Sequence, residues 1–149
     1  MRNSNIFPRH TNYDLPISAY GEGCYVFYIN GKKYLDGSCG AAVSCLGHSD
    51  STIKDAIIKQ TEKLAFAHTS FFTSEPAEEL ASILSLNSPK GLDKVYFVSS
   101  GSEAVEASLK LAKQYFNEIG KPQKHKVISR RQSYHGNTLG ALAAGGNIW

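Results

Sequence analysis

The chain has 149 residues, of which 42% are hydrophobic and 19% are charged, and this composition predicts one folded domain with an apolar core. Sixteen Lys and Arg side chains against 13 Asp and Glu side chains give a net charge of +3, which is too small and too scattered to indicate a nucleic-acid partner. The three cysteines lack a Cys-x-x-Cys spacing, and no apolar run approaches the roughly 18 residues of a membrane span. We therefore expect a soluble, cytoplasmic protein without a disulfide framework, a metal site or a membrane partner.

The N-terminal part predicts an irregular arm followed by a β-hairpin. Residues 2–20 contain two prolines and show no periodicity, so we expect them to lie over the surface without regular structure. Two apolar runs, residues 24–29 and 32–36, flank the pair Asn30-Gly31. This pair is typical of a type I′ turn, in which both central residues have positive φ.

The middle of the chain predicts two amphipathic helices. Residues 37–47 are rich in Gly, Ala, Ser and Cys, which favours a closely packed crossing but indicates no regular element. Apolar residues then recur at helical spacing from residue 50 to about residue 64, with lysines on the opposite face. A second helix is predicted to begin at residues 74–76, Ser-Glu-Pro, and the Asn-Ser-Pro-Lys-Gly stretch at 87–91 ends it.

The C-terminal half predicts a strand, a helix and a second strand. The apolar run at residues 95–98 stops at a turn of small residues, 99–102, and helical periodicity continues from there to residue 119. Gly120 stands where a helix C′ residue is expected, and residues 126–129 form another short buried-type run. This order predicts a βαβ unit with two parallel strands, so the fold class is α/β.

The turn before the long helix predicts an anion site. Ser100 and Glu103 fit a capping box, and Gly101 lets a bound group approach the backbone at the positive end of the helix dipole. The turn has neither a Walker A sequence nor a Gly-x-Gly-x-x-Gly fingerprint, and such a turn alone could equally be a well-capped helix start. The loop after the second strand, residues 130–136, should open at the same sheet edge, where the ring of Tyr134 could lie against a flat phosphorylated ligand.

Four ordered motifs carry a resemblance to a known family. The motifs are Gly31 to Gly37, Leu46-Gly47-His48, Val95 to Ala112, and Tyr134-His135-Gly136-Asn137-Thr138. Through them, the stretch from residue 21 to residue 145 resembles the start of the class III (omega-amino-acid) aminotransferases, fold type I enzymes that use pyridoxal 5′-phosphate (PLP). The resemblance implies that residues 1–45 are an arm and hairpin of the small domain and that residues 46–149 begin the PLP-binding large domain.

The resemblance also implies roles for individual residues. In the family, the residues that match Gly101 and Ser102 hold the cofactor phosphate, and Ser100 belongs to the same turn. The aromatic residue that matches Tyr134 stacks on the pyridine ring, whereas the alternative for Tyr134 is an ordinary half-buried core tyrosine. His135 follows in the same motif, and we expect it to shape the loop.

Three other polar residues receive structural rather than catalytic interpretations. Glu103 is expected to cap the helix, and Glu106 is expected to pair with Lys110 at spacing i+4, since charges on a helix face are usually solvated. His48 is expected to pack at a helix start. The sequence therefore indicates cofactor-binding residues but no catalytic residue.

By resemblance, the full-length protein is a homodimer that transfers an amino group from an amino acid or amine to a 2-oxo acid. The family's Schiff-base lysine and the aspartate at the pyridine nitrogen lie downstream of the Tyr-His-Gly motif, and no lysine here has a matching context. We expect this chain alone to be inactive. Two other classes stay open, a noncatalytic PLP or phosphate-binding module and a structural fragment, and an aminomutase or decarboxylase would share the same motifs.

Overall fold

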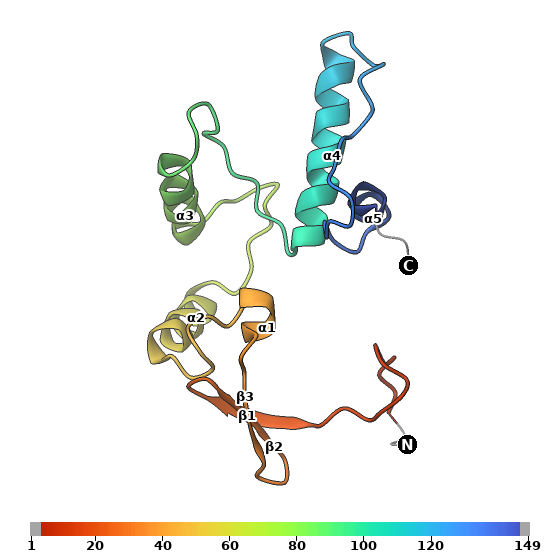
Figure 1. The fold of residues 1–149 in the computed structure, drawn as a ribbon. Helices are drawn as coiled ribbons and strands as arrows, with labels where there is room; N and C mark the ends of the chain where they lie inside the picture. Colours follow the sequence, from red (N-terminus) through yellow and green to blue (C-terminus); the bar gives the residue numbers. More distant parts are fainter. Residues whose placement is uncertain (1–3, 147–149) are drawn as a thin grey trace. The chain divides into compact units, whose positions relative to one another are not determined.

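A computed structural model describes residues 4–146, and these divide after Thr73 into two compact units (Figure 1). The composition predicts a single domain, and this stays a prediction. The domain boundary implied after residue 45 concerns the complete family fold and stays a prediction.

The first unit contains a three-stranded antiparallel sheet with strand order β1-β2-β3. Tyr20 in β1 lies opposite Phe27 in β2, and their rings stack with centroids 4.4 Å apart. The end of the predicted irregular arm thus forms a strand, because an aromatic pair across two strands stabilises their pairing. The strands are β1 (Ser18–Glu22), β2 (Tyr25–Tyr28) and β3 (Lys33–Leu35).

The predicted hairpin is confirmed, but its turn is not of type I′. Gly31 has φ +85°, whereas Asn30 does not have a positive φ. The Gly31 N–H donates to the Tyr28 carbonyl at 2.9 Å, and the Tyr28 N–H donates to the Lys32 carbonyl at 2.8 Å. This is the pattern of a three-residue loop, a type I turn followed by a left-handed glycine. The Asn30 side chain also accepts from the Lys32 N–H at 3.1 Å, which stabilises this alternative.

Two helical segments complete the first unit. α1 (Cys39–Ala42) is a single turn in which all four residues have positive φ, from 50° to 70°, so it is left-handed. α2 (Ser51–Lys63) confirms the first predicted helix, and the Asp50 side chain caps it by accepting from the Ile53 N–H at 3.0 Å.

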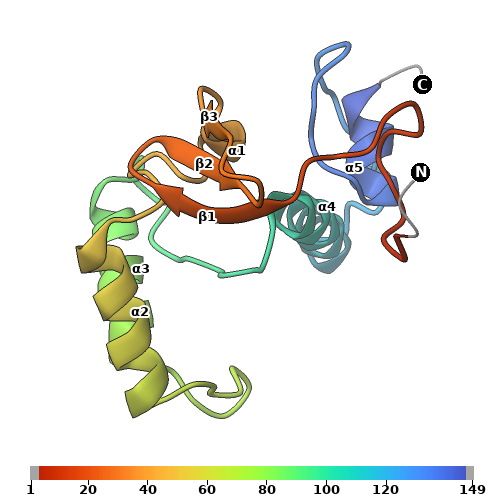
Figure 2. The ribbon, with the colours of Figure 1, turned by 90° about the horizontal axis from the view of Figure 1, so that it is seen from below.

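The second unit contains three helices, of which α4 and α5 pack against each other (Figures 1 and 2). The predicted end of the long helix is confirmed: Gly120 has φ +72°, and the Lys121 N–H donates to the Phe116 carbonyl at 2.7 Å, as in a Schellman motif. α5 was not predicted. The helices are α3 (Glu75–Leu86), α4 (Gly101–Glu118) and α5 (Leu139–Gly145).

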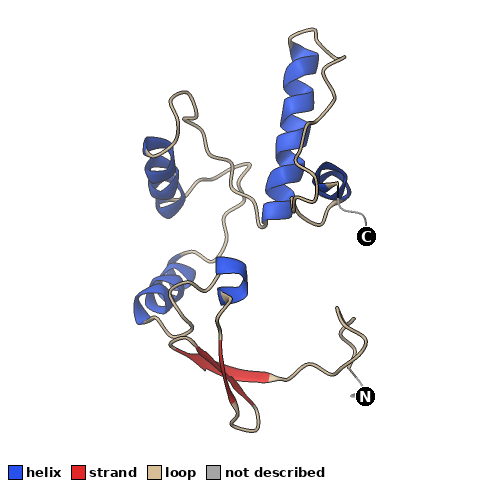
Figure 3. Cartoon of the chain, in the orientation of Figure 1, coloured by secondary structure: helices blue, strands red, loops and turns tan. Residues whose placement is uncertain are grey.

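The two predicted parallel strands are not formed. Residues 95–98 and 126–129 have no regular secondary structure, and Figure 3 draws the chain on both sides of α4 as loop. A strand exists through its ladder of hydrogen bonds with a neighbour, and neither segment has such a neighbour among the described residues. The fold is therefore mixed α/β, because an antiparallel sheet is followed by helices, but the predicted βαβ unit is not formed.

Among residues 4–146, buried residues occur only in α5 and in the loop that precedes it. Within residues 4–146, Ala141 in α5 is the only buried apolar side chain, at 0% exposure, whereas Ile128 is 98% exposed. Gly136 and Gly145 are also buried. The expected large apolar core is absent from the described residues.

Candidate phosphate and ring site

The N-terminus of α4 is capped as the sequence predicts, with one difference. The Ser100 hydroxyl accepts from the Glu103 N–H at 3.2 Å. The Glu103 carboxylate accepts from the Ser99 N–H at 2.7 Å, one residue before the partner that a capping box normally uses. Glu103 therefore has the predicted structural role, and it fixes the backbone of the turn.

Two backbone N–H groups remain available at this helix start. The Glu103 N–H bonds to Ser100 and the Ala104 N–H donates to the Ser100 carbonyl, whereas those of Gly101 and Ser102 have no acceptor among the described residues. A Cβ built on Gly101 would meet no atom within 4 Å, so a bound group can approach it. Free N–H groups at the positive end of an 18-residue helix favour an anion.

The loop of residues 134–138 docks on this turn. The Asn137 N–H donates to the Ser102 hydroxyl oxygen at 2.9 Å. Gly136 is buried with φ +125°, and a Cβ there would lie 2.8 Å from the Ser102 Cα. The predicted meeting of turn and loop is confirmed by these contacts, although the sheet expected to bring them together is not formed. Because Ser102 accepts from Asn137, its hydroxyl proton is free to donate to a ligand.

Tyr134 and His135 lie differently in this loop. The Tyr134 side chain is 77% exposed, so it is not the half-buried core tyrosine of the alternative interpretation. The His135 Nε2 atom is buried and has no hydrogen-bond partner within residues 4–146. His135 lines an open, mostly apolar hollow of about 440 Å³ together with Val105, Leu109 and residues 127–130. Such an unsatisfied ring nitrogen is costly to bury and indicates a missing polar partner.

Sequence reasoning missed the contact that ties the loop to the side of α4. The Thr138 hydroxyl donates to the Glu106 carboxylate at 2.5 Å and accepts from the Ala141 N–H at 3.2 Å, which caps α5. The predicted pairing of Glu106 with Lys110 is wrong, because the carboxylate lies against Thr138. A threonine three residues before the Ala141 amide was a readable cap signal; the partner of Glu106 was not, because it depends on a contact distant in sequence.

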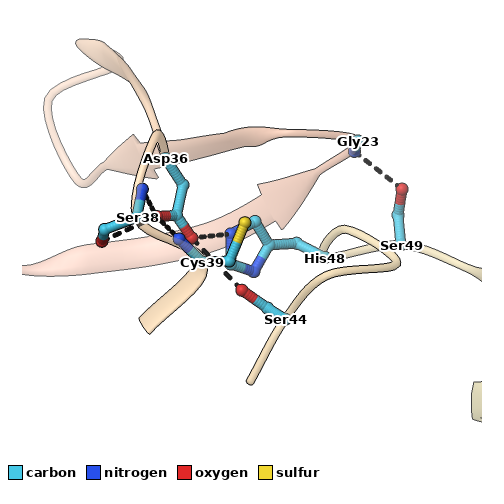
Figure 4. Close-up of polar contacts among 7 residues, drawn as sticks. All are labelled: Gly23, Asp36, Ser38, Cys39, Ser44, His48 and Ser49. Carbon is cyan, nitrogen blue, oxygen red and sulfur yellow. Dashed lines mark hydrogen bonds and ion pairs between the residues drawn. The ribbon is translucent and has the colours of Figure 1, made fainter. Parts of the chain in front are cut away.

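A second polar cluster lies in the first unit, around Asp36 (Figure 4). Its carboxylate binds His48 Nε2 at 2.9 Å, the Cys39 N–H at 2.9 Å, the Ser38 N–H at 3.3 Å and the Ser44 hydroxyl at 3.3 Å. Desolvation acts to raise the pKa of Asp36, but the hydrogen bonds from His48, Cys39, Ser38 and Ser44 outweigh it and hold the pKa below its usual value. His48 therefore pairs with Asp36, and its predicted packing at a helix start stays a prediction.

Among residues 4–146, no three His, Cys, Asp or Glu side chains lie together as metal ligands would. None of the described helices has the length and apolar character needed to cross a bilayer.

Comparison with known proteins identifies the family. The family Aminotransferase class-III matches residues 8–148. An uncharacterized aminotransferase of Schizosaccharomyces pombe is 43% identical over 141 residues, which are 95% of this chain and 31% of that protein.

Solved structures agree with this match. An (S)-enantioselective omega-transaminase of Thermomicrobium roseum has a TM-score of 0.89 at 35% identity, covering 97% of this chain and 34% of that chain. The omega transaminase of Pseudomonas jessenii in complex with PMP has a TM-score of 0.86 at 33% identity, covering 95% and 33%. The chain thus spans about a third of the length of these relatives. It belongs to the class III aminotransferase family and corresponds to the N-terminal part of its members.

Proposed function

We propose that this chain is the N-terminal portion of a PLP-dependent aminotransferase that moves an amino group from an amino acid or amine to a 2-oxo acid. The observation that carries the proposal is the hydrogen bond from the Asn137 N–H to the Ser102 hydroxyl. This bond brings the loop containing Tyr134 to the anion-binding start of α4. A phosphorylated aromatic cofactor needs both features in one place.

The phosphate group is proposed to bind at the start of α4. The free N–H groups of Gly101 and Ser102 and the Ser102 hydroxyl proton supply three donors, and Ser100 fixes the turn that presents them. Charge-assisted hydrogen bonds of this kind are about twice as strong as neutral ones. The residues present therefore fit the phosphate end of PLP.

The ring of the cofactor is proposed to stack on Tyr134. Its side chain is exposed and lies two residues before Gly136, whose backbone packs on Ser102. His135 follows Tyr134 in this loop, and its buried Nε2 is proposed to find a polar partner in the complete enzyme. The relative with PMP binds a ligand with the same phosphate and ring.

The bound cofactor would supply the electron sink that amino-group transfer needs. In this chain, Gly101, Ser102 and Tyr134 would bind and orient it. No lysine here has the sequence context of the family's Schiff-base lysine, so we propose that residues 1–149 bind PLP but do not transaminate. The complete enzyme is proposed to work as a homodimer.

The test is a titration of the 149-residue chain with PLP, followed by absorbance and fluorescence. We expect saturable binding that Tyr134→Ala weakens, whereas Tyr115→Ala, an exposed tyrosine on α4, serves as the matched control. Borohydride treatment should trap no stoichiometric lysine adduct. Equal binding by the two variants, or only scattered lysine adducts, would contradict the proposed site.

A noncatalytic PLP-binding module is the second candidate. It is favoured by the observation that the hydrogen bond joining the turn and the loop lies within residues 99–138. If a longer gene product contains no lysine in the sequence context of the family's Schiff-base lysine, the protein is a noncatalytic module. A longer product with that lysine, and with transamination abolished when it is changed, would decide for the enzyme.

A further inference from the structure

Glu106 makes a contact that its place on a helix face does not suggest. It lies in the second turn of α4, and its carboxylate accepts from the Thr138 hydroxyl at 2.5 Å in a partly buried position. This distance is in the range of hydrogen bonds between a hydroxyl and an ionised carboxylate, which are stronger than neutral ones. The carboxylate is thus engaged across 32 residues of sequence.

Thr138 is the residue through which such a contact can act on the candidate site. Its hydroxyl oxygen also accepts from the Ala141 N–H at 3.2 Å, so it fixes the start of α5. The preceding residue, Asn137, donates its N–H to the Ser102 hydroxyl. Thr138 therefore lies between two attachment points of the chain: Asn137 bonds to the phosphate turn, and the Thr138 hydroxyl caps α5. A contact that holds Thr138 in place keeps the segment between these points fixed.

The chain also leaves space for the Glu106 carboxylate. A Cβ built on Gly140 would lie 2.5 Å from Glu106 Oε2 and 2.9 Å from Oε1. Carboxylate oxygens alone could swing away from a small clash, but these are held by Thr138. Glycine at residue 140 thus permits the approach of α5 to a fixed carboxylate.

We propose that Glu106 is a positioning residue, which holds the 134–138 loop through Thr138 so that Tyr134 stays over the phosphate turn at Ser102. That Tyr134 and Ser102 bind PLP rests on the proposed function, whereas the effect of Glu106 on the position of the loop does not. Among the described residues, the Glu106 carboxylate hydrogen-bonds to the Thr138 hydroxyl and to none of the proposed phosphate donors. Its removal should affect ring binding while leaving the phosphate turn intact.

The experiment compares variants of the 149-residue chain. Glu106→Ala removes the acceptor, Glu106→Gln keeps a neutral acceptor, and Glu118→Gln is the matched control, a charge change at the far end of the same helix. Thr138→Val alone and combined with Glu106→Ala completes a double-mutant cycle, in which the loss of the α5 cap cancels. Each variant is titrated with PLP and with inorganic phosphate, and amide hydrogen exchange is measured by NMR at Asn137.

We expect Glu106→Ala to weaken PLP binding about tenfold, since a hydrogen bond to a charged group contributes at least that factor. Phosphate affinity should change by less than about twofold because the α4 N–H groups are untouched. Exchange at Asn137 should rise about tenfold in Glu106→Ala, less in Glu106→Gln and not in Glu118→Gln. In the double-mutant cycle, adding Glu106→Ala to Thr138→Val should change PLP affinity and Asn137 exchange little further.

The outcomes separate the two proposals. If the unsubstituted chain binds neither PLP nor phosphate, but Glu106→Ala raises exchange at Asn137, the positioning role stands and the proposed function fails for this chain. An Asn137 amide that exchanges equally in all variants would overturn the positioning role. So would an equal loss of PLP and phosphate affinity, because that result would mean a general loss of structure.

Discussion

Replacement of Gly136 by alanine tests whether the loop must contact the phosphate turn directly. Gly136 is buried with φ +125°, and an added Cβ would lie 2.8 Å from the Ser102 Cα and 2.8 Å from its Oγ. The first of these atoms belongs to the backbone of α4 and cannot move without disturbing the helix start. Gly136→Ala must therefore displace the loop.

The expected cost has two parts. A positive φ at a residue with a side chain costs about 1–3 kcal/mol. Forcing a methyl group into a packed contact costs about another 1–3 kcal/mol. Gly91→Ala is the matched control, because Gly91 has φ +93° but a Cβ there would meet nothing within 4 Å. It carries the first cost alone and lies in a different loop.

Native-state hydrogen exchange at the Asn137 amide, which bonds to Ser102, measures this cost locally. A loss of about 2 kcal/mol corresponds to about 30-fold faster exchange. We expect at least that acceleration in Gly136→Ala, together with weaker PLP binding, and no change at Asn137 in Gly91→Ala. Acceleration of less than about threefold in Gly136→Ala would refute the close contact between loop and turn.

Three further substitutions test the turn and the Asp36 cluster. Gly101→Asp fits the open space at its position, and an acidic residue suits a helix start, so the circular dichroism spectrum should not change. Binding of phosphate and of PLP should be lost. Retained binding would mean that the turn is only a helix cap. Ser100→Ala removes the hydroxyl that accepts from the Glu103 N–H and should destabilise α4 by about 1 kcal/mol. Hydrogen exchange at the Glu103 amide measures this loss, and unchanged exchange would contradict the cap. Because the folded-state pKa of Asp36 is lowered, its contribution to stability is present above the ordinary carboxyl pKa of about 4 and is lost as pH falls through the lower folded value. Asp36→Asn should therefore flatten the acid limb of unfolding followed by near-ultraviolet circular dichroism, and identical acid limbs would argue against the cluster.

Features that depend on a few neighbouring residues could be predicted from the sequence. The starts of α2 and α4 follow from Asp50 and Ser100, whose side chains bond to amides three residues later. The end of α4 follows from Gly120, which alone among common residues adopts a left-handed conformation without cost. The hairpin was predictable for the same reason, although a different turn forms, in which the Asn30 side chain accepts a hydrogen bond from the Lys32 N–H.

Features that depend on contacts distant in sequence could not be predicted in the same way. Asp36 and His48 are 12 residues apart, and Glu106 and Thr138 are 32 residues apart. Each of the four residues also has a plausible local interpretation, such as helix pairing for Glu106, and nothing in the local pattern excludes it. The meeting of the 99–102 turn with the loop after residue 129 was expected only through a βαβ unit and a family resemblance, and the hydrogen bond from Asn137 to Ser102 forms without the sheet.

The unformed strands give the last prediction. Residues 95–98 and 126–129 have the β-branched and aromatic side chains of strands, but strand stability comes from cross-strand pairs, and the described chain supplies no neighbour. We expect their amides to exchange rapidly in the 149-residue chain and to become protected in a chimera extended with the remaining two thirds of an aminotransferase relative. The amides of α4 should be protected in both, because its caps are local. Protection of residues 95–98 in the 149-residue chain would show that a sheet partner already exists. Rapid exchange there, with a protected Asn137, would show that the phosphate turn and its loop assemble before the sheet that later surrounds them.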